Sequence, residues 1–286
     1  MTSQQKQKAV FTGLLFITSL LGWRPLLTTL SLSWRNDEYT YILLIVPFSI
    51  ALFFLERPAK HLASGWGIPV GLPLLLSAVG LAVAVGILPS RLVWDMRLSC
   101  EMLAIVLSYV GSFVLCFGLE STRRAVFPLV CLFGLIPLPD VVMNQTVAIL
   151  QEGSAWSAHV LLSVFGVPVV QNGVILKIPD LTIQVAQECS SIRSSSLLLI
   201  TALISAKVLL RSPWHRFLVI ALAIPLSVAK NGLRIFTIAI LGTRVDPAYL
   251  TGRLHRQGGI LFFLVALVGI FLAITIVRRR ENLPAF

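Results

Sequence analysis

The amino-acid sequence alternates long apolar runs with short polar breaks, and this pattern predicts helices that cross a membrane. A helical run needs about 20 apolar residues to span about 30 Å of hydrocarbon. About eight runs serve as candidate spans, over residues 9–32, 39–55, 68–88, 98–119, 125–138, 191–210, 214–241 and 258–277. We therefore expect an all-α polytopic membrane protein with about eight transmembrane helices.

Two breaks in the pattern refine this expectation. The first run follows a basic, polar N-terminus, is too long for a signal peptide and lacks a small-residue cleavage site, so it reads as a retained span. Arg24-Pro25 interrupts it near its outer end. The fifth run is short and stops at Ile136-Pro137-Leu138-Pro139-Asp140, since proline cannot continue a helix. We expect Asp140 to cap the helix that follows.

Composition and charge agree with a membrane protein. With 57% hydrophobic and 12% charged residues, the chain is not a soluble domain. We expect the net charge of +11 to orient the chain in the membrane and to contact lipid headgroups. The basic residues do not cluster with aromatic residues, as they would in a nucleic-acid groove. Basic flanks at the predicted inner ends place both termini in the cytoplasm. We expect residues 1–286 to form a single integral membrane domain, with membrane lipid but no nucleic acid as a partner.

One long segment, 139–188, does not follow the spanning pattern. Its first half, to about residue 165, spaces polar residues at helical intervals and predicts an amphipathic helix. Residues 169–187 alternate in polarity, with turn signals at Asn172-Gly173 and Pro179-Asp180, and predict short strands. We expect an extracytoplasmic or interfacial insertion whose small β element lies on the outer face, directly before Cys189.

The cysteines show no metal-binding spacing, and we expect neither a metal nor an organic cofactor. Cys100, Cys116 and Cys131 lie within apolar runs, where a thiol packs as a small hydrophobe. Cys189 differs because it stands at the start of the predicted helix 191–210. A helix N-terminus and a nearby arginine both favour the thiolate form.

The predicted orientation brings three polar residues to one membrane level. Cys189 begins the sixth span at the outer face, Arg234 lies near the outer end of the seventh, and His255 directly precedes the eighth. Together they offer a nucleophile, a cation for a thiolate or oxyanion, and a proton shuttle. Taken singly, they also fit an interfacial thiol, a snorkelling anchor and a solvated loop residue.

Neighbouring residues suit supporting roles. Arg193 lies four residues after Cys189 on the same helix face, and Asn231 shares a face with Arg234. Glu188 favours the helix N-terminus electrostatically. We expect His159 and His215 to be structural, since His215 falls at the inner face.

Three motifs in order resemble the exosortase/archaeosortase family over about residues 95–277. They are Glu-Cys-Ser-Ser-Ile-Arg-Ser from 188, Asn-Gly-Leu-Arg-Ile from 231 and His-Arg-Gln-Gly-Gly from 255. The Pro-rich break at 136–140 is similar as well. The family's catalytic Cys, Arg and His match Cys189, Arg234 and His255. One position departs: Ser191 stands where the family commonly carries the Gly of Cys-Ser-Gly.

The resemblance implies a membrane cysteine peptidase and transpeptidase of the bacterial inner membrane, with its active site on the periplasmic face. Such enzymes cleave C-terminal sorting signals of the PEP-CTERM type through a thioacyl-enzyme. Their protein substrates carry a short motif, a transmembrane helix and a basic tail. Arg193 would then position an acidic residue of the substrate tail.

Two other classes stay open from the residues alone. A transporter or flippase for envelope polysaccharide would need polar residues at mid-membrane and paired broken helices, for which only the Asn231 region gives a hint. A non-catalytic component of polysaccharide assembly would need no reactive thiol. A membrane acyl- or glycosyl-ligase would favour carboxylates over a thiol.

Overall fold

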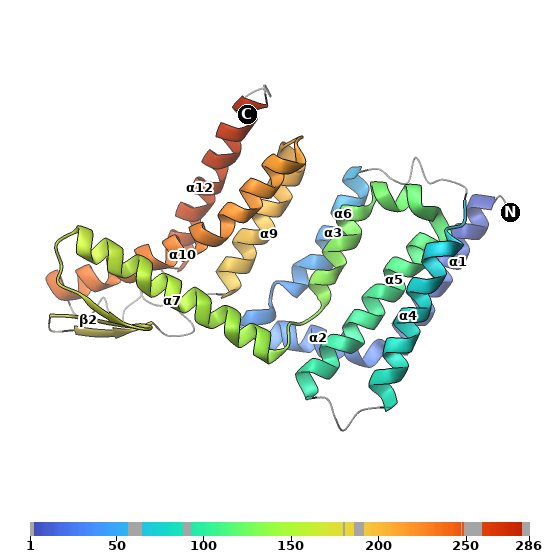
Figure 1. The fold of residues 1–286 in the computed structure, drawn as a ribbon, viewed down its shortest axis with the longest axis horizontal. Helices are drawn as coiled ribbons and strands as arrows, with labels where there is room; N and C mark the ends of the chain where they lie inside the picture. Colours follow the sequence, from blue (N-terminus) through green and yellow to red (C-terminus); the bar gives the residue numbers. More distant parts are fainter. Residues whose placement is uncertain are drawn as a thin grey trace. The chain divides into compact units, whose positions relative to one another are not determined.

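Helices make up most of the described chain, as the apolar runs predict (Figure 1). The computed structural model describes residues 3–56, 65–87, 93–179, 181–185, 192–246, 248 and 259–281. Backbone contacts gather into two compact units, Met1–Met143 and Asn144–Phe286, and each is described by itself.

The first unit is helical throughout its described residues. Its elements are α1 (Ser3–Leu21), α2 (Trp23–Arg35), η1 (Asp37–Tyr39), α3 (Ile42–Glu56), α4 (Ile68–Ile87), α5 (Trp94–Arg124), α6 (Val126–Cys131) and η3 (Leu132–Leu135). Helix α7 (Asp140–Val164) begins within it and continues into the second unit. The second unit adds strands β1 (Val170–Asn172), β2 (Ile175–Ile178) and β3 (Leu181–Gln184), then helices α9 (Ile192–Leu209), α10 (Pro213–Arg244) and α12 (Gly259–Arg280).

The predicted polytopic membrane class is confirmed. Six described segments are long and apolar enough to cross a membrane, and the number rises to eight if two bent helix pairs each count as one span. Large apolar side chains such as Leu76, Phe54 and Ile260 are exposed, as expected for surfaces that face lipid. The cytoplasmic placement of both termini and the single-domain organisation remain predictions.

The first predicted span is a bent pair rather than one helix. Helices α1 and α2 meet at Gly22 with an angle of 72°. The break lies just before Arg24-Pro25, so both residues fall in the first turn of α2. Proline is tolerated there because the first helical amides have no intrahelical acceptor to lose.

The Pro-rich stop at 136–140 is where α7 begins, and the first unit fixes it by side-chain contacts. Asp140 is the first residue of α7, and its backbone amide donates to Asp95 Oδ2 at 2.7 Å. The capping carboxylate therefore belongs to Asp95 on α5, not to Asp140 as predicted. Ser99 donates to Pro137 O at 2.6 Å and Tyr39 to Leu138 O at 2.9 Å, which holds the carbonyls that the prolines leave without helical partners.

Helices α4 and α5 form the tightest contact of the first unit. A side chain at Gly71 would overlap the backbone of Leu115, whose Cα lies 2.5 Å from the position of a Cβ. Gly67 N donates to Leu115 O at 2.9 Å, so the two backbones touch at the start of α4. Small residues allow such close approach between helices in a membrane, where packing replaces the hydrophobic effect.

The predicted β element is present in the second unit. Strands β1, β2 and β3 form an antiparallel meander, with Asn172 paired to Ile175 and Ile178 to Leu181. The first turn contains Gly173 at φ 59°, as the Asn-Gly signal predicts. The sheet packs on α7 and α10 through a cluster of Ala155, Ala158, Leu176, Val185 and Ile235.

Helices α9, α10 and α12 lie side by side as an antiparallel bundle (Figure 1). Their shared core is rich in alanine, with Ala202, Ala206, Ala223 and Ala266 all buried. The C-terminal end of α12 meets the beginning of α10 at Glu281, which accepts from Arg211 N at 2.9 Å, from Ser212 N at 3.0 Å and contacts His215 Nδ1 at 2.7 Å. His215 thus has the structural role expected for it.

We expect Gly71→Ala to destabilise the protein, because the added methyl group meets backbone rather than a flexible side chain. Overpacking of this kind costs about 1–3 kcal/mol. Thermal unfolding of the purified protein in detergent measures the loss. Gly80→Ala in the same helix is the matched control, since a Cβ there has nothing within 4 Å. Equal unfolding temperatures for the two variants would contradict the packing described.

We expect Glu281→Gln to lower stability at neutral pH but not in acid. Burial of the Glu281 side chain opposes ionisation, but the hydrogen bonds from Arg211, His215 and Ser212 outweigh it and lower its pKa from 4.5 to about 2. Because its pKa is lower in the folded protein, the ionised Glu281 carboxylate stabilises the fold fully above about pH 4.5, and this contribution is lost as the pH falls toward 2. Unfolding temperatures should therefore differ at pH 7 and converge in acid. Glu120→Gln, in an exposed pair with Arg124, should have little effect at any pH.

Candidate functional site

The residues predicted to form the site come from the second unit, and the structure describes half of them. Arg193 lies in the first turn of α9, and Asn231 and Arg234 lie on α10. Glu188, Cys189 and His255 lie outside the described residues.

Helix α10 carries one polar face through an otherwise apolar sequence. Ser227, Lys230, Asn231 and Arg234 follow at i, i+3, i+4 and i+7, so all four lie on one side of the helix. Ser227, Lys230 and Asn231 are buried, with Lys230 only 5% exposed, and Arg234 is partly buried. A buried ammonium and a guanidinium one turn apart make this face strongly cationic.

The first turn of α9 supplies hydroxyl groups to this polar face. Lys230 Nζ donates a hydrogen bond to Ser194 Oγ. The hydroxyls of Ser195 and Ser227 are 2.5 Å apart. These contacts place the N-terminal end of α9 beside the middle of α10, next to the residues that precede Arg234 by one to two turns. Arg193, in the same turn of α9, is exposed.

Helix α7 approaches the opposite part of the same stretch of α10. A Cβ at Gly232 would overlap the Ser157 side chain and would lie 3.0 Å from Ala158 N. One turn earlier on α7, Gly153 faces the Val228 side chain, and a Cβ added at Gly153 would lie 3.1 Å from Val228 Cγ1. The Asn-Gly pair at 231–232 therefore combines a buried polar group with a close helix crossing.

The end of β3 also lies next to Arg234. Val185 is buried in the cluster that contains Ile235, the residue after Arg234. Its backbone is fixed on both sides, because Val185 N donates to Val174 O at 3.0 Å and Val185 O accepts from Gln151 Nε2 at 3.1 Å. Val185 thus lies beside Ile235, and α9 begins at Ile192, two residues before the partner of Lys230. These two described residues both lie near the same stretch of α10.

The register of α12 against α10 gives the level of Gly259, the first residue of α12. Glu281 contacts His215, and Gly269 faces Leu226, with a built Cβ 3.0 Å from Cδ2. Continued in antiparallel register, this pairing brings Gly259, the first residue of α12, level with about residue 236 of α10. The N-terminal ends of α9 and α12 therefore lie at the end of α10 that carries Arg234.

Four polar residues of this contact were not among the predicted site residues: Lys230, Ser194, Ser195 and Ser227. A detectable signal existed, because four polar residues at i, i+3, i+4 and i+7 within a spanning run are rare and costly. The pairing with the serines of α9 was not predictable, since it depends on the register between two helices. Within the described residues, no group of three His, Cys, Asp or Glu side chains could hold a metal ion.

Comparison with protein families decides the identity of the chain. The model described as transmembrane exosortase (Exosortase_EpsH) matches residues 33–272. The chain belongs to the transmembrane exosortase family. The resemblance found in the three sequence motifs is thereby confirmed, and the match extends it toward the N-terminus. No curated protein and no solved structure matches this exosortase.

The match covers most of both units of the exosortase, from α2 in the first unit to α12 in the second. Membership of this family agrees with the membrane-spanning helices, so the chain is a multi-pass membrane protein. The roles of Cys189, Arg234 and His255, and the supporting roles of Arg193, Asn231 and Glu188, remain predictions.

We expect Ser194→Ala to destabilise the exosortase, because it removes the hydroxyl that accepts from the buried Lys230 ammonium. Leaving a buried polar donor unsatisfied costs about 1–3 kcal/mol. Thermal unfolding in detergent provides the measurement. Ser196→Ala is the matched control, since the Ser196 hydroxyl forms no hydrogen bond with a described residue. Similar unfolding temperatures in the two variants would show that the Lys230–Ser194 contact contributes nothing.

Proposed function

We propose that this exosortase is a membrane cysteine transpeptidase that cleaves C-terminal sorting signals of exported proteins. The observation that carries the proposal is the convergence of described elements on Arg234. The end of β3 and the start of α9 lie near this residue, and the register of α12 brings its first residue, Gly259, to about the same level of α10. Cys189 precedes α9 by three positions and His255 precedes α12 by four.

The cationic face of α10 favours the chemistry of a thiolate nucleophile. Lys230 and Arg234 lie one turn apart and stabilise an anion between the converging elements. The N-terminal end of α9 adds its partial positive charge, since the first amides of a helix have no intrahelical acceptor. These groups are held by packing, so they need no reorganisation as negative charge develops.

The proposed reaction has two steps. Cys189 Sγ attacks the scissile carbonyl carbon, and Arg234 stabilises the negative charge on the oxygen of the tetrahedral intermediate. The C–N bond then breaks, His255 gives a proton to the leaving amine, and a thioester remains on Cys189. In the second step an acceptor amine or water attacks the thioester, His255 removes its proton, and the C–S bond breaks to restore the thiolate.

The substrate of this proposal is a protein with a C-terminal motif, a transmembrane helix and a basic tail. A multi-pass enzyme receives such a helix laterally from the membrane. Arg193, exposed in the first turn of α9, positions an acidic residue of the motif. Asn231 and Glu188 support the polar face and the start of α9. The proposed setting is the bacterial inner membrane with the site on the periplasmic face.

We expect Cys189→Ala to abolish precursor processing in cells, because no other group replaces the thiolate. Immunoblotting of an exported protein with a sorting tail measures the ratio of precursor to processed form. Arg234→Gln and His255→Gln should lower processing by about 10²-fold or more, as expected for loss of oxyanion or acid–base groups. Arg234→Lys keeps the charge and should retain part of the activity.

Cys131→Ala is the matched control, since Cys131 lies on α6 in the first unit. It should process the precursor as the wild type does. Protein level and membrane insertion are compared for every variant. Intact processing by Cys189→Ala at normal protein level would refute the transpeptidase and favour a non-catalytic role in envelope polysaccharide assembly.

A further inference from the structure

The first unit holds a large apolar groove with a polar end. It has a volume of about 910 Å³ and lies among α1, α2, α4 and α5. Its deep end is lined by residues such as Leu14, Leu75 and Ile105, and its polar end by Arg24, Arg97 and Glu101. Along α5 the lining runs from Trp94 to Ser108, or about 21 Å at a helical rise of about 1.5 Å per residue. This is somewhat more than half of a hydrocarbon core of about 30 Å, so the groove is long enough for the acyl chains of one lipid leaflet.

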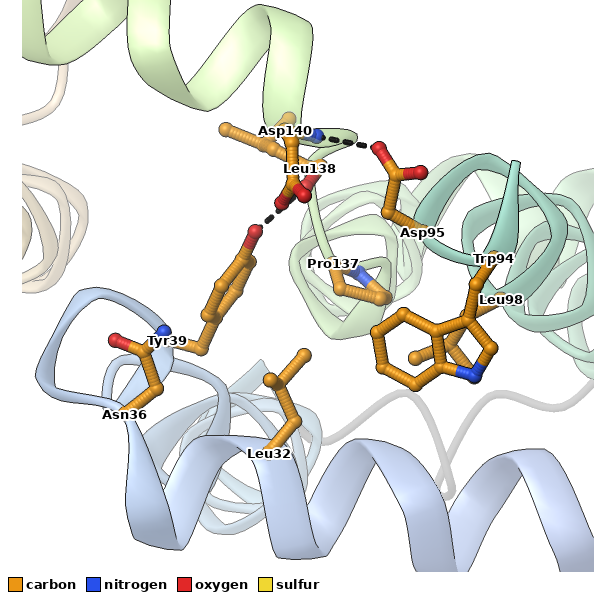
Figure 2. A pocket seen from close by; sticks show the side chains of 9 residues that line it. All are labelled: Leu32, Asn36, Tyr39, Trp94, Asp95, Leu98, Pro137, Leu138 and Asp140. Atoms are coloured by element: carbon orange, nitrogen blue, oxygen red, sulfur yellow. Dashed lines mark hydrogen bonds between the residues drawn. The ribbon is translucent and has the colours of Figure 1, made fainter.

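A second, smaller pocket adjoins the polar end. It has a volume of about 220 Å³ and shares Trp94 and Leu98 with the groove. Figure 2 shows Trp94 and Leu98 on one side of this pocket and Tyr39 on the other, with Asp95 and Asp140 above. The two cavities therefore adjoin at Trp94 and Leu98, which are one turn apart on α5.

The charges of the two cavities are opposite. In the groove, Arg97 pairs with Glu101 at 2.9 Å, whereas Arg24 lies over the Trp23 ring at 5.7 Å and pairs with no described carboxylate. Arg24, Arg97 and Glu101 together leave one positive charge. In the pocket, Asp95 and Asp140 contribute two negative charges, and neither forms an ion pair with a described residue.

We propose that the groove and the pocket together bind one molecule of phosphatidylethanolamine. Its acyl chains fill the apolar groove, its phosphate lies at Arg24 and Arg97, and its ammonium group enters the pocket toward Asp95 and Asp140. Two methylene groups separate phosphate from ammonium in this headgroup, a short distance that suits two cavities adjoining at Trp94 and Leu98. Only a zwitterionic lipid complements both charges, and a primary ammonium also donates hydrogen bonds to carboxylates.

This inference is independent of the proposed peptidase chemistry. It concerns residues of the first unit alone, so loss of Cys189 activity would not bear on it. The anionic phosphatidylglycerol offers the groove a phosphate but offers the pocket no cation. Phosphatidylcholine offers a cation that cannot donate hydrogen bonds. Comparison of these lipids therefore separates recognition of the headgroup from simple filling of an apolar groove.

Native mass spectrometry of the purified full-length chain tests the proposal. The delipidated protein is mixed with equal amounts of the three lipids, all with identical acyl chains. We expect the bound fraction of phosphatidylethanolamine to exceed that of phosphatidylglycerol by about tenfold. The double variant Asp95→Asn/Asp140→Asn should lose this preference, while the amide oxygen introduced at position 95 can still accept the hydrogen bond from the backbone amide of residue 140. Glu120→Gln, at the far end of α5, should keep it.

A second variant tests the groove without touching the charges. Ala82 lines the groove and is exposed, so Ala82→Trp should narrow it and weaken binding of all three lipids alike, while the unfolding temperature stays near that of the wild type. Equal binding of phosphatidylethanolamine and phosphatidylglycerol by the wild type would overturn the proposal. An unchanged preference in the Asp95/Asp140 double variant would do the same.

Discussion

The second unit depends on the burial of polar groups from α10 within an apolar helical bundle. Lys230, Ser227 and Asn231 are nearly inaccessible to solvent. A buried ammonium is tolerated only where another group accepts its hydrogen bonds, and Ser194 provides that acceptor. The contact between Ser195 and Ser227 lies beside it on the same pair of helices. Sliding α9 along α10 by one turn would separate both pairs at once, so these bonds fix the register of the two helices.

That register determines what lies near Arg234. Because α9 begins beside Lys230, its first turn lies about one helical turn from Arg234 along α10. The sheet acts from the other side, since Val185 packs with Ile235 and its carbonyl is held by Gln151 of α7. Gly232 allows α7 to approach closely enough for both contacts. Val185 and the first turn of α9 are therefore both fixed against α10.

The first unit combines structural and chemical demands in a different way. Asp95 caps the amide of Asp140 and at the same time contributes a negative charge to the pocket beside Trp94. Ser99 and Tyr39 hold the carbonyls of the Pro-rich break, so this turn is fixed by three side chains from two elements, α5 and a 3₁₀ turn. Both the break and the residues that support it lie within the region matched by the exosortase family. The break therefore shapes a cavity as well as ending a helix.

The sequence by itself determined the class of the protein, because apolar runs of spanning length leave few alternatives. It also determined the β element, since alternating polarity and an Asn-Gly signal act locally. Three ordered motifs were sufficient for the family, which the comparison confirmed. The Arg24-Pro25 pair predicted an interruption of the first span, and only its exact place at Gly22 was missed. The cap from Asp95 was not predictable, because it depends on which helices are neighbours. The same holds for Lys230 and Ser194, which are 36 residues apart in sequence. Local patterns record which side chains a helix presents, but only tertiary packing decides which side chain on another helix meets them.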